Sequence, residues 1–326
     1  MENTDAIGAL DLPAGPLRDA YVALNHLYVQ TRRHGAALRE GQRLFMSSAH
    51  AASHQGFALL GDNGAGKTTT VRQLESWLRK KLGLAPDAPS PLPILTMHAD
   101  MSPRGFVEAL LDVYGDPMST TGKRADLDKR LSRYLKRAGH IHGIVLDELQ
   151  HGFIGKTGRQ KMLMTATLKN FISECPRPVL GLGPMTLEEH LDGDPALQQR
   201  FAERCFLEDL RLDLDDDLHD VRSVLKGMDE VLPSAPGCKL DSADMLKRLY
   251  VAGRASFGRK VRVVRLACSY GAIDGASTVQ VQHYSRAWRA VAPRKLRHDK
   301  HDPFLLDSAT VTKLAAQLGT KVQADD

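Results

Sequence analysis

The chain has 326 residues, of which 42% are hydrophobic and 25% are charged, and its net charge at pH 7 is +5. That length allows one sizeable core with one or two smaller elements. No apolar stretch reaches the length of a membrane span, and the N-terminus lacks the regions of a secretory signal, so we expect a cytoplasmic protein without membrane segments. The four widely spaced cysteines fit reduced thiols, and the positive charge permits nucleic-acid binding without establishing it.

Residues 1–54 are predicted to form a largely helical N-terminal extension. Apolar residues recur at helical spacing over 17–28, and Pro16 suits a first helical position. A second apolar cluster covers residues 38–46. This extension either packs on the core or serves a partner, and periodicity alone does not distinguish the two.

The apolar run 57–60 leads directly into residues 61–68, which spell a complete phosphate-binding loop (P-loop). The motif requires a buried strand before the glycine-rich turn and a helix after it, and both patterns are present. The glycines let backbone N–H groups point inward as an anion nest, and the helix N-terminus adds positive potential. Lys67 is expected to reach the β- and γ-phosphates of a nucleoside triphosphate, and the Thr68 hydroxyl to ligate Mg²⁺. The expected nucleotide contacts are Gly61, Asp62, Asn63, Gly64, Ala65, Gly66, Lys67, Thr68 and Thr69.

The segment after the P-loop alternates helices with short apolar strands. Beyond the helix that the loop opens, we predict a Pro-rich link at 86–93, a strand at 94–97, a helix at 106–114, a basic helix at 127–137, a strand at 141–146, a helix at 161–172 and a strand at 179–182. Apolar strands that alternate with helices indicate a parallel sheet covered on both faces. We therefore predict the α/β class.

The pattern changes from about residue 214, where an acidic stretch suits the start of a helix. Helical patterns continue to about residue 291 without an evident buried strand, and the segment after Pro293 is basic. We therefore divide the chain into an N-terminal extension, a P-loop core, a helical subdomain and a basic tail, over residues 1–54, 55–211, 212–291 and 292–326.

Residues 144–148 form an apolar strand that ends in two acids, Asp147 and Glu148. In P-loop ATPases the first acid holds Mg²⁺ and the second can activate the attacking water. A parallel sheet delivers both carboxylates to its C-terminal edge, beside the P-loop. A small-molecule kinase needs no general base here, because its substrate supplies the hydroxyl, so the pair favours hydrolysis. Without the P-loop, the same pattern would fit a strand end followed by a helix cap.

With these motifs the chain resembles the AAA+ ATPases, and within them the transposition regulators of the TniB/TnsC type. The resemblance runs from about residue 55 to residue 290 and is carried by residues 61–68, 106–117, 146–151, 179–184 and 194–201. It implies an ATP- and Mg²⁺-dependent homo-oligomer, a ring or helical filament, that assembles on double-stranded DNA. It also implies DNA-stimulated ATP hydrolysis, a helical lid in the C-terminal subdomain, and recruitment of transposase subunits to a target chosen by a target-selector protein.

The resemblance also implies two arginines that act on nucleotide. Arg200 lies where similar proteins place an arginine finger, which offsets transition-state charge in the neighbouring subunit, and Arg204 is the second choice. The alternative is an ordinary arginine that ends a surface helix. Arg259 lies where a sensor arginine of the lid would contact nucleotide, and its basic surroundings fit a solvated or DNA-facing helix equally well.

One position departs from the family pattern. Similar proteins carry a polar residue after the fourth strand that senses the γ-phosphate, whereas this chain has Gly183 followed by Pro184. Proline offers neither a hydroxyl nor an N–H group. Either Thr186 substitutes for the missing group or hydrolysis is slow, which would suit a switch that times assembly.

The resemblance places DNA inside the oligomer, in contact with loops after the second strand. There the chain offers Arg104, Thr121, Lys123 and Arg124, which suit contacts to backbone phosphates. The alternative is a solvated helix start, because acidic residues nearby partly neutralise the patch. Basic residues over 286–300 are a second DNA candidate, although such tails also bind protein partners.

Two further functions remain open beside the transposition regulator. One is another AAA+ ATPase, such as a secretion-associated or remodelling motor, and the other is a scaffold that binds nucleotide and hydrolyses it slowly. The basic loops and the helical C-terminal subdomain disfavour a P-loop phosphotransferase.

Overall fold

The computed structural model describes residues 11–48, 56–137, 139–254 and 256–321. These form two compact units. The α/β unit comprises the described residues of 33–208, and the helical unit comprises the described residues up to Arg32 together with those from Asp209 onward. The first ten residues, residue 55 where we place the start of the core, and the end of the tail at 322–326 lie outside the described residues.

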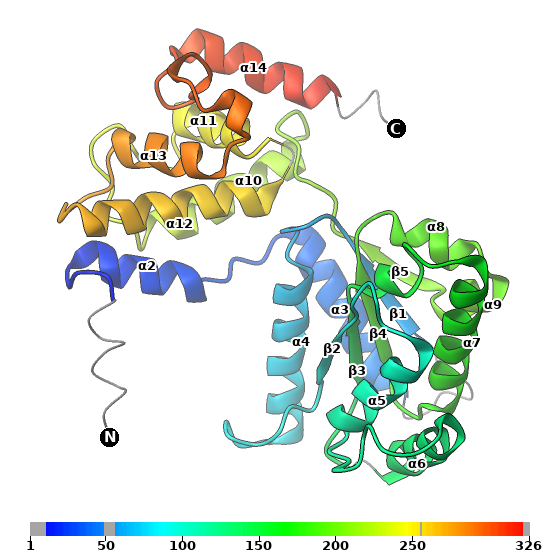
Figure 1. The fold of residues 1–326 in the computed structure, drawn as a ribbon. Helices are drawn as coiled ribbons and strands as arrows, with labels where there is room; N and C mark the ends of the chain where they lie inside the picture. Colours follow the sequence, from blue (N-terminus) through cyan, green and yellow to red (C-terminus); the bar gives the residue numbers. More distant parts are fainter. Residues whose placement is uncertain (1–10, 49–55, 138, 255, 322–326) are drawn as a thin grey trace. The chain divides into compact units, whose positions relative to one another are not determined.

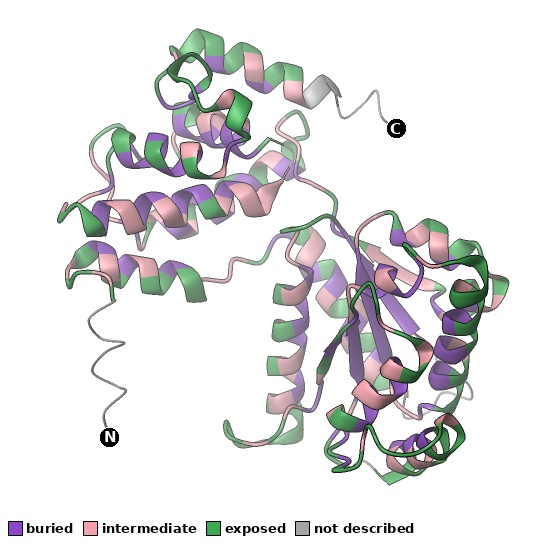
Figure 2. Cartoon of the chain, in the orientation of Figure 1, coloured by how far each residue is buried: buried purple, intermediate pink, exposed green. Residues whose placement is uncertain are grey.

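The α/β unit is built on a parallel sheet whose strand order is β2-β3-β4-β1-β5. The strands are β1 (Gly56–Leu60), β2 (Ile94–Thr96), β3 (Ile144–Asp147), β4 (Val179–Gly183) and β5 (Glu203–Phe206). All residues of β1 and β4 are buried, as expected for central parallel strands (Figure 2). The predicted α/β class is confirmed. The edge strand β5 was not predicted, because its partly exposed residues lack the apolar run of a buried strand.

Helices cover both faces of this sheet (Figure 1). Side chains alternate along each strand, so Phe57 and Leu59 of β1 pack with helices α3 and α4, whereas Ala58 and Leu60 belong to the core formed with helices α5 to α9. The helices are α3 (Arg32–Ser48), α4 (Lys67–Leu82), α5 (Pro103–Val113), α6 (Arg124–Arg137), α7 (Gly158–Glu174), α8 (Leu187–Asp192) and α9 (Pro195–Arg200), with the short turn η1 (Leu149–Gly152) after β3.

The helical unit gathers elements from both ends of the chain. It contains α2 (Pro16–His26), α10 (Asp215–Asp229), α11 (Ala243–Gly253), α12 (Phe257–Ile273), α13 (Val281–Val291) and α14 (Ser308–Lys321). Leu17 and Leu24 of α2 are buried in its core, and their carbonyl oxygens accept hydrogen bonds from Cys268 Sγ (3.1 Å) and Arg265 Nη2 (2.8 Å) of α12. The segment before the P-loop therefore divides, with α2 in the helical unit and α3 on the sheet.

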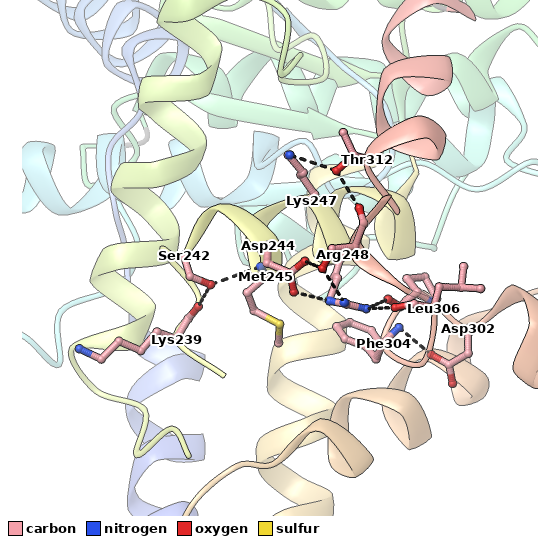
Figure 3. Close-up of polar contacts among 12 residues, drawn as sticks. Lys239, Ser242, Asp244, Met245, Lys247, Arg248, Asp302, Phe304, Leu306 and Thr312 are labelled. Atoms are coloured by element: carbon pink, nitrogen blue, oxygen red, sulfur yellow. Dashed lines mark hydrogen bonds and ion pairs between the residues drawn. The ribbon is translucent and has the colours of Figure 1, made fainter. Parts of the chain in front are cut away.

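Helix α14 docks on α11 through polar contacts (Figure 3). Arg248 Nη1 donates to Pro303 O (2.6 Å) and Leu306 O (2.8 Å), and its Nε pairs with Asp244 Oδ2 (2.6 Å). The Ser308 hydroxyl, at the first turn of α14, donates to the other oxygen of Asp244 (2.7 Å). Part of the basic segment after Pro293 is thus folded onto the helical unit. None of the described helices combines the length and the apolar character needed to cross a membrane.

Candidate nucleotide-binding site

The P-loop links the end of β1 to the start of α4. Gly64 and Gly66 have φ values of 86° and 92°, a left-handed conformation that favours glycine. Gly61 N donates to Gly183 O (3.1 Å), which ties the loop to the end of β4. A Cβ on Gly61 would lie 2.6 Å from Leu207 O, so only glycine fits there. The loop therefore curls as an anion nest requires, and its tip at Asp62, Asn63 and Gly64 is exposed.

The Lys67 side chain lies on the inner side of the P-loop. Its Nζ donates to Gly61 O (2.5 Å) and Asp62 O (3.2 Å), so the amine occupies the concave side of the turn. Burial lowers the pKa of Lys67, and the carboxylates of Glu148 and Asp147 are the main influences that raise it. The P-loop lysine and the acid pair, which are far apart in the sequence, therefore lie within electrostatic reach of one another.

The acid pair stands at the C-terminal end of β3. Asp147 is the last residue of the strand, and its Oδ1 accepts a hydrogen bond from Glu148 N (2.9 Å). Burial raises the pKa of Asp147, whereas the hydrogen bond from Glu148 N opposes that rise. Glu148 has φ 55° and ψ 39°, a left-handed conformation that costs free energy for a residue with a side chain. Backbone strain of this kind concentrates at functional sites.

These residues suit a nucleotide with its metal. The loop N–H groups and the Lys67 amine are donors for phosphate oxygens, and the Thr68 hydroxyl and Asp147 carboxylate are the hard oxygen ligands that Mg²⁺ prefers. Thr68 is half-buried and Thr69 is exposed in the first turn of α4. The loop curvature, the donor set and the nearby acids together fit a triphosphate.

The end of β4 carries the departure noted in the sequence. Gly183 is buried, and Pro184 is half-buried with its carbonyl oxygen accepting from Leu187 N (3.0 Å). Thr186 is exposed at the N-cap of α8, where its side chain makes no capping hydrogen bond. Whether Thr186 replaces the missing polar residue stays a prediction.

The two finger candidates differ in how firmly they are held. Arg200 ends α9, and its guanidinium donates to the Ser173 hydroxyl (2.7 Å from Nη2) and to Ala196 O (2.9 Å). Arg204 of β5 pairs with Asp192 (2.7 Å) and Glu188 (3.4 Å), and only 11% of its side chain is exposed. Because Arg204 is committed to two carboxylates, Arg200 is the better candidate to reach a neighbouring molecule.

Arg259 lies near the start of α12, in the helical unit. Its backbone N donates to Oγ of the cap residue Ser256 (3.4 Å), and the residue as a whole is half-buried. Because the P-loop belongs to the other unit, a contact of Arg259 with nucleotide stays a prediction.

The four DNA candidates gather around the connection between α5 and α6. Arg104 Nη2 donates to Thr120 O (3.1 Å), which holds the start of α5 against the loop that carries Thr121 and Lys123. Arg104 and Arg124 also pair with acids one turn on, Glu108 (2.7 Å) and Asp128 (2.8 Å). Thr121 and Lys123 are exposed. The structure therefore brings these residues into one surface segment, with part of its positive charge neutralised.

The sequence of the α/β unit matches a known protein family. The family model described as "Bacterial TniB protein" matches residues 25–208, more than half of the chain. The chain belongs to the TniB family. This match ends where the α/β unit ends, so the family's shared part contains the P-loop, the acid pair and Arg200. No curated protein sequence matches this TniB chain.

Solved structures show that this TniB protein has the AAA+ fold of origin-recognition proteins. It is similar to the ORC1 protein of Aeropyrum pernix in complex with DNA, with TM-score 0.62, 17% identity, and coverage of 86% of this chain and 70% of that chain. The ORC2 protein of Aeropyrum pernix, as ADPNP–ADP complexes, matches with TM-score 0.60 and 13% identity, and the match covers 86% of this chain and 72% of that chain. Cdc6p of Pyrobaculum aerophilum matches with TM-score 0.58 and 12% identity, and the match covers 85% of this chain and 71% of that chain.

Two further residues of the TniB site were not predicted to take part in it. His34 of α3 lies beneath the P-loop, with Nε2 at 2.9 Å from Ala65 O. A Cβ on Gly66 would lie 2.3 Å from that nitrogen, so the histidine occupies the space that the glycine leaves. Gln150, two residues after the general-base candidate, donates to Glu148 Oε2 (2.5 Å). The His34 contact depends on tertiary geometry, because it joins residues 31 apart in the sequence. The Gln150 contact is local and lies in the 146–151 segment that carries the family resemblance, but the resemblance assigned Gln150 no role.

Proposed function

We propose that this TniB protein is an ATP-dependent AAA+ regulator of DNA transposition. In this function it oligomerises on double-stranded target DNA and recruits or activates a transposase, and ATP hydrolysis controls assembly. One observation carries the proposal: a complete P-loop after β1, on the same edge of the parallel sheet as Asp147 and Glu148 at the end of β3, in a chain of the TniB family.

Hydrolysis follows from the side chains at the sheet edge. Lys67 exchanges its contacts with Gly61 O and Asp62 O for phosphate oxygens. Thr68 and Asp147 would hold Mg²⁺, which would supply positive charge to neutralise the phosphates. Glu148 takes a proton from water as the water oxygen bonds to the γ-phosphorus and the bond to the ADP oxygen breaks. The products are ADP, phosphate and a protonated Glu148 that returns its proton to solvent.

A second copy of the chain completes the site. Arg200 leaves the Ser173 hydroxyl and offsets charge on the γ-phosphate of a neighbouring subunit. Arg259 contacts the nucleotide from the lid of its own subunit. A head-to-tail interface of this kind repeats into a closed ring or a helical filament.

DNA contact is assigned to the connection between α5 and α6. The ion pairs of Arg104 and Arg124 with neighbouring acids are partly exposed at the surface, so they contribute modest stability and can exchange for DNA phosphates. Lys123 and Thr121 add a charge and a hydroxyl at the same surface. The DNA complex of the ORC1 protein of similar fold supports this function. The transposase and the target-selector protein are partners that the family resemblance implies, in the cytoplasm.

The test is ATP turnover and particle size with and without duplex DNA. We expect duplex DNA to raise turnover severalfold and to shift the ATP-bound protein to larger assemblies. Lys123→Ala should weaken DNA binding and with it the DNA-stimulated rise in turnover. The salt dependence of DNA binding should decrease by the amount expected for the loss of about one phosphate contact. Lys81→Ala is the matched control, because it removes an exposed charge from α4, on the opposite face of the sheet from α5 and α6. If neither ATP turnover nor particle size changed when duplex DNA was added, the proposal would be contradicted.

A second candidate function is a scaffold that holds ATP and hydrolyses it slowly. Pro184 favours it, because the end of β4 has no polar side chain at that position. This candidate predicts assembly with ATP on DNA and almost no phosphate release. The same pair of measurements therefore separates the two functions.

A further inference from the structure

Gln150 is a buried polar residue beside the general-base candidate. It lies in the turn η1, directly after β3, and only 6% of it is exposed. Its Nε2 donates to Glu148 Oε2 at 2.5 Å. An ionised carboxylate can only accept hydrogen bonds, so the nitrogen of the amide must face Glu148 and its oxygen must face away. The contact therefore fixes the orientation of the amide.

The other end of the amide lies against the end of β4. A Cβ on Gly183 would be 3.0 Å from Gln150 Oε1, so the amide fills space that the glycine leaves open. Gln150 Oε1 is buried, and within the described part of the chain it has no hydrogen-bond partner. A buried acceptor without a partner costs free energy, so the buried amide needs a role other than stability. Gln150 thus lies between Glu148, after β3, and Gly183 at the end of β4.

Glu148 needs such a contact. Its backbone is held in a left-handed conformation, and its side chain is 37% exposed, with rotamers open to solvent. His151 Nε2 lies 4.0 Å from Glu148 Oε2, beyond hydrogen-bond distance. The amide of Gln150 is therefore the group that orients the carboxylate.

We propose that Gln150 is a positioning residue for Glu148, and that it supplies the polar side chain that Pro184 cannot supply at this edge of the sheet. The role rests on the proposed ATP hydrolysis. Gln150 holds Oε2, so that Oε1 of Glu148 remains free to take the proton of the attacking water. Its own Oε1, next to the end of β4, is an acceptor for a second hydrogen at the site.

The contact is testable in the nucleotide-free protein by exchanging its partners. Gln150→Glu places two carboxylates together above neutral pH and should lower the unfolding temperature by about 3 °C. The double variant Glu148→Gln with Gln150→Glu restores an amide–carboxylate pair with the roles reversed and should recover most of that loss. Glu148→Gln alone serves as the control. A double variant as unstable as Gln150→Glu would overturn the contact.

Kinetics separate positioning from space filling. Gln150→Met keeps the length and volume of the side chain but removes the amide. We expect kcat for ATP hydrolysis to fall about tenfold to a hundredfold while KM, and the affinity for a fluorescent ATP analogue, stay within about twofold. A Gln150→Met variant that hydrolyses ATP at the unaltered rate or faster would overturn this role alone. Absence of hydrolysis by the unaltered protein would instead overturn the proposed function, and the role with it.

Discussion

The residue that follows β4 is Pro184, where the resemblance to AAA+ proteins leads us to expect a polar side chain. Proline has neither a hydroxyl nor an N–H group, so this position cannot hydrogen-bond to a phosphate or to water through its side chain. We expect Pro184→Thr to raise kcat for ATP hydrolysis by up to about tenfold, because it adds a donor at the edge of the sheet. Phosphate release at saturating ATP measures this.

The matched control for that prediction is Pro184→Ala. It removes the ring without adding a hydroxyl, and it keeps the carbonyl oxygen that accepts from Leu187 N. Its kcat should remain near that of the unaltered protein. If Pro184→Ala raised turnover as much as Pro184→Thr, the proline ring rather than a missing hydroxyl would be what limits turnover.

The same site shows which residues a sequence can reveal. The P-loop and the acid pair were predictable because each is a local motif whose chemistry requires fixed residue types at fixed spacing. Gln150 was not predictable as a site residue, because its contact depends on the left-handed backbone of Glu148 and on the turn that follows. His34 reaches the P-loop from another helix, and no pattern in the sequence connects the two.

At the scale of elements, the segment that leads into α14 is held by one half-buried guanidinium, that of Arg248. Arg248 is 13% exposed at its side chain and donates to two carbonyl oxygens of the segment that leads into α14. Arg248→Ala leaves those oxygens without this donor, so we expect a loss of about 1–3 kcal/mol in the free energy of unfolding. Chemical denaturation of the whole protein measures it.

Lys247→Ala is the control on the same helix. Lys247 Nζ donates to Thr312 Oγ1 (3.1 Å) at an exposed position, and such contacts contribute little. Its removal should change the free energy of unfolding by less than about 0.5 kcal/mol. Equal losses in the two variants would show that α14 is held by its apolar contacts rather than by Arg248.

Two elements show where the sequence was ambiguous. The apolar face of α2 was recognisable, but periodicity says only that a face is covered and not which element covers it. Its partner is α12, whose Cys268 and Arg265 donate to α2 carbonyl oxygens. Strand β5 lies at the edge of the sheet and is half-exposed, so its sequence lacks the continuous apolar run that identified the inner strands.

At the scale of the whole molecule, the proposed arginine finger predicts complementation between subunits. Arg200→Ala retains Glu148 but offers no finger, whereas Glu148→Gln offers a finger but has no base. Each should be nearly inactive alone, and an equal mixture should regain about a quarter of the unaltered ATP turnover, because that share of head-to-tail interfaces combines both intact residues.

Arg204→Ala tests the specificity of this complementation. Arg204 is held by Asp192 and Glu188 within its own chain, so its loss is a defect of that subunit alone. A mixture of Arg204→Ala with Glu148→Gln should show no gain beyond the sum of its parts. If the Arg200→Ala mixture stayed inactive as well, Arg200 would not act across an interface.

The division of the helical unit between the two ends of the chain has a consequence for synthesis. Helix α2 leaves the ribosome first, but α12 follows only after the whole α/β unit has been made. At ordinary translation rates that interval lasts roughly ten to forty seconds. Until α12 emerges, Leu17 and Leu24 lack the helix that covers them, so the nascent chain presents an amphipathic helix to chaperones while the α/β unit is being made.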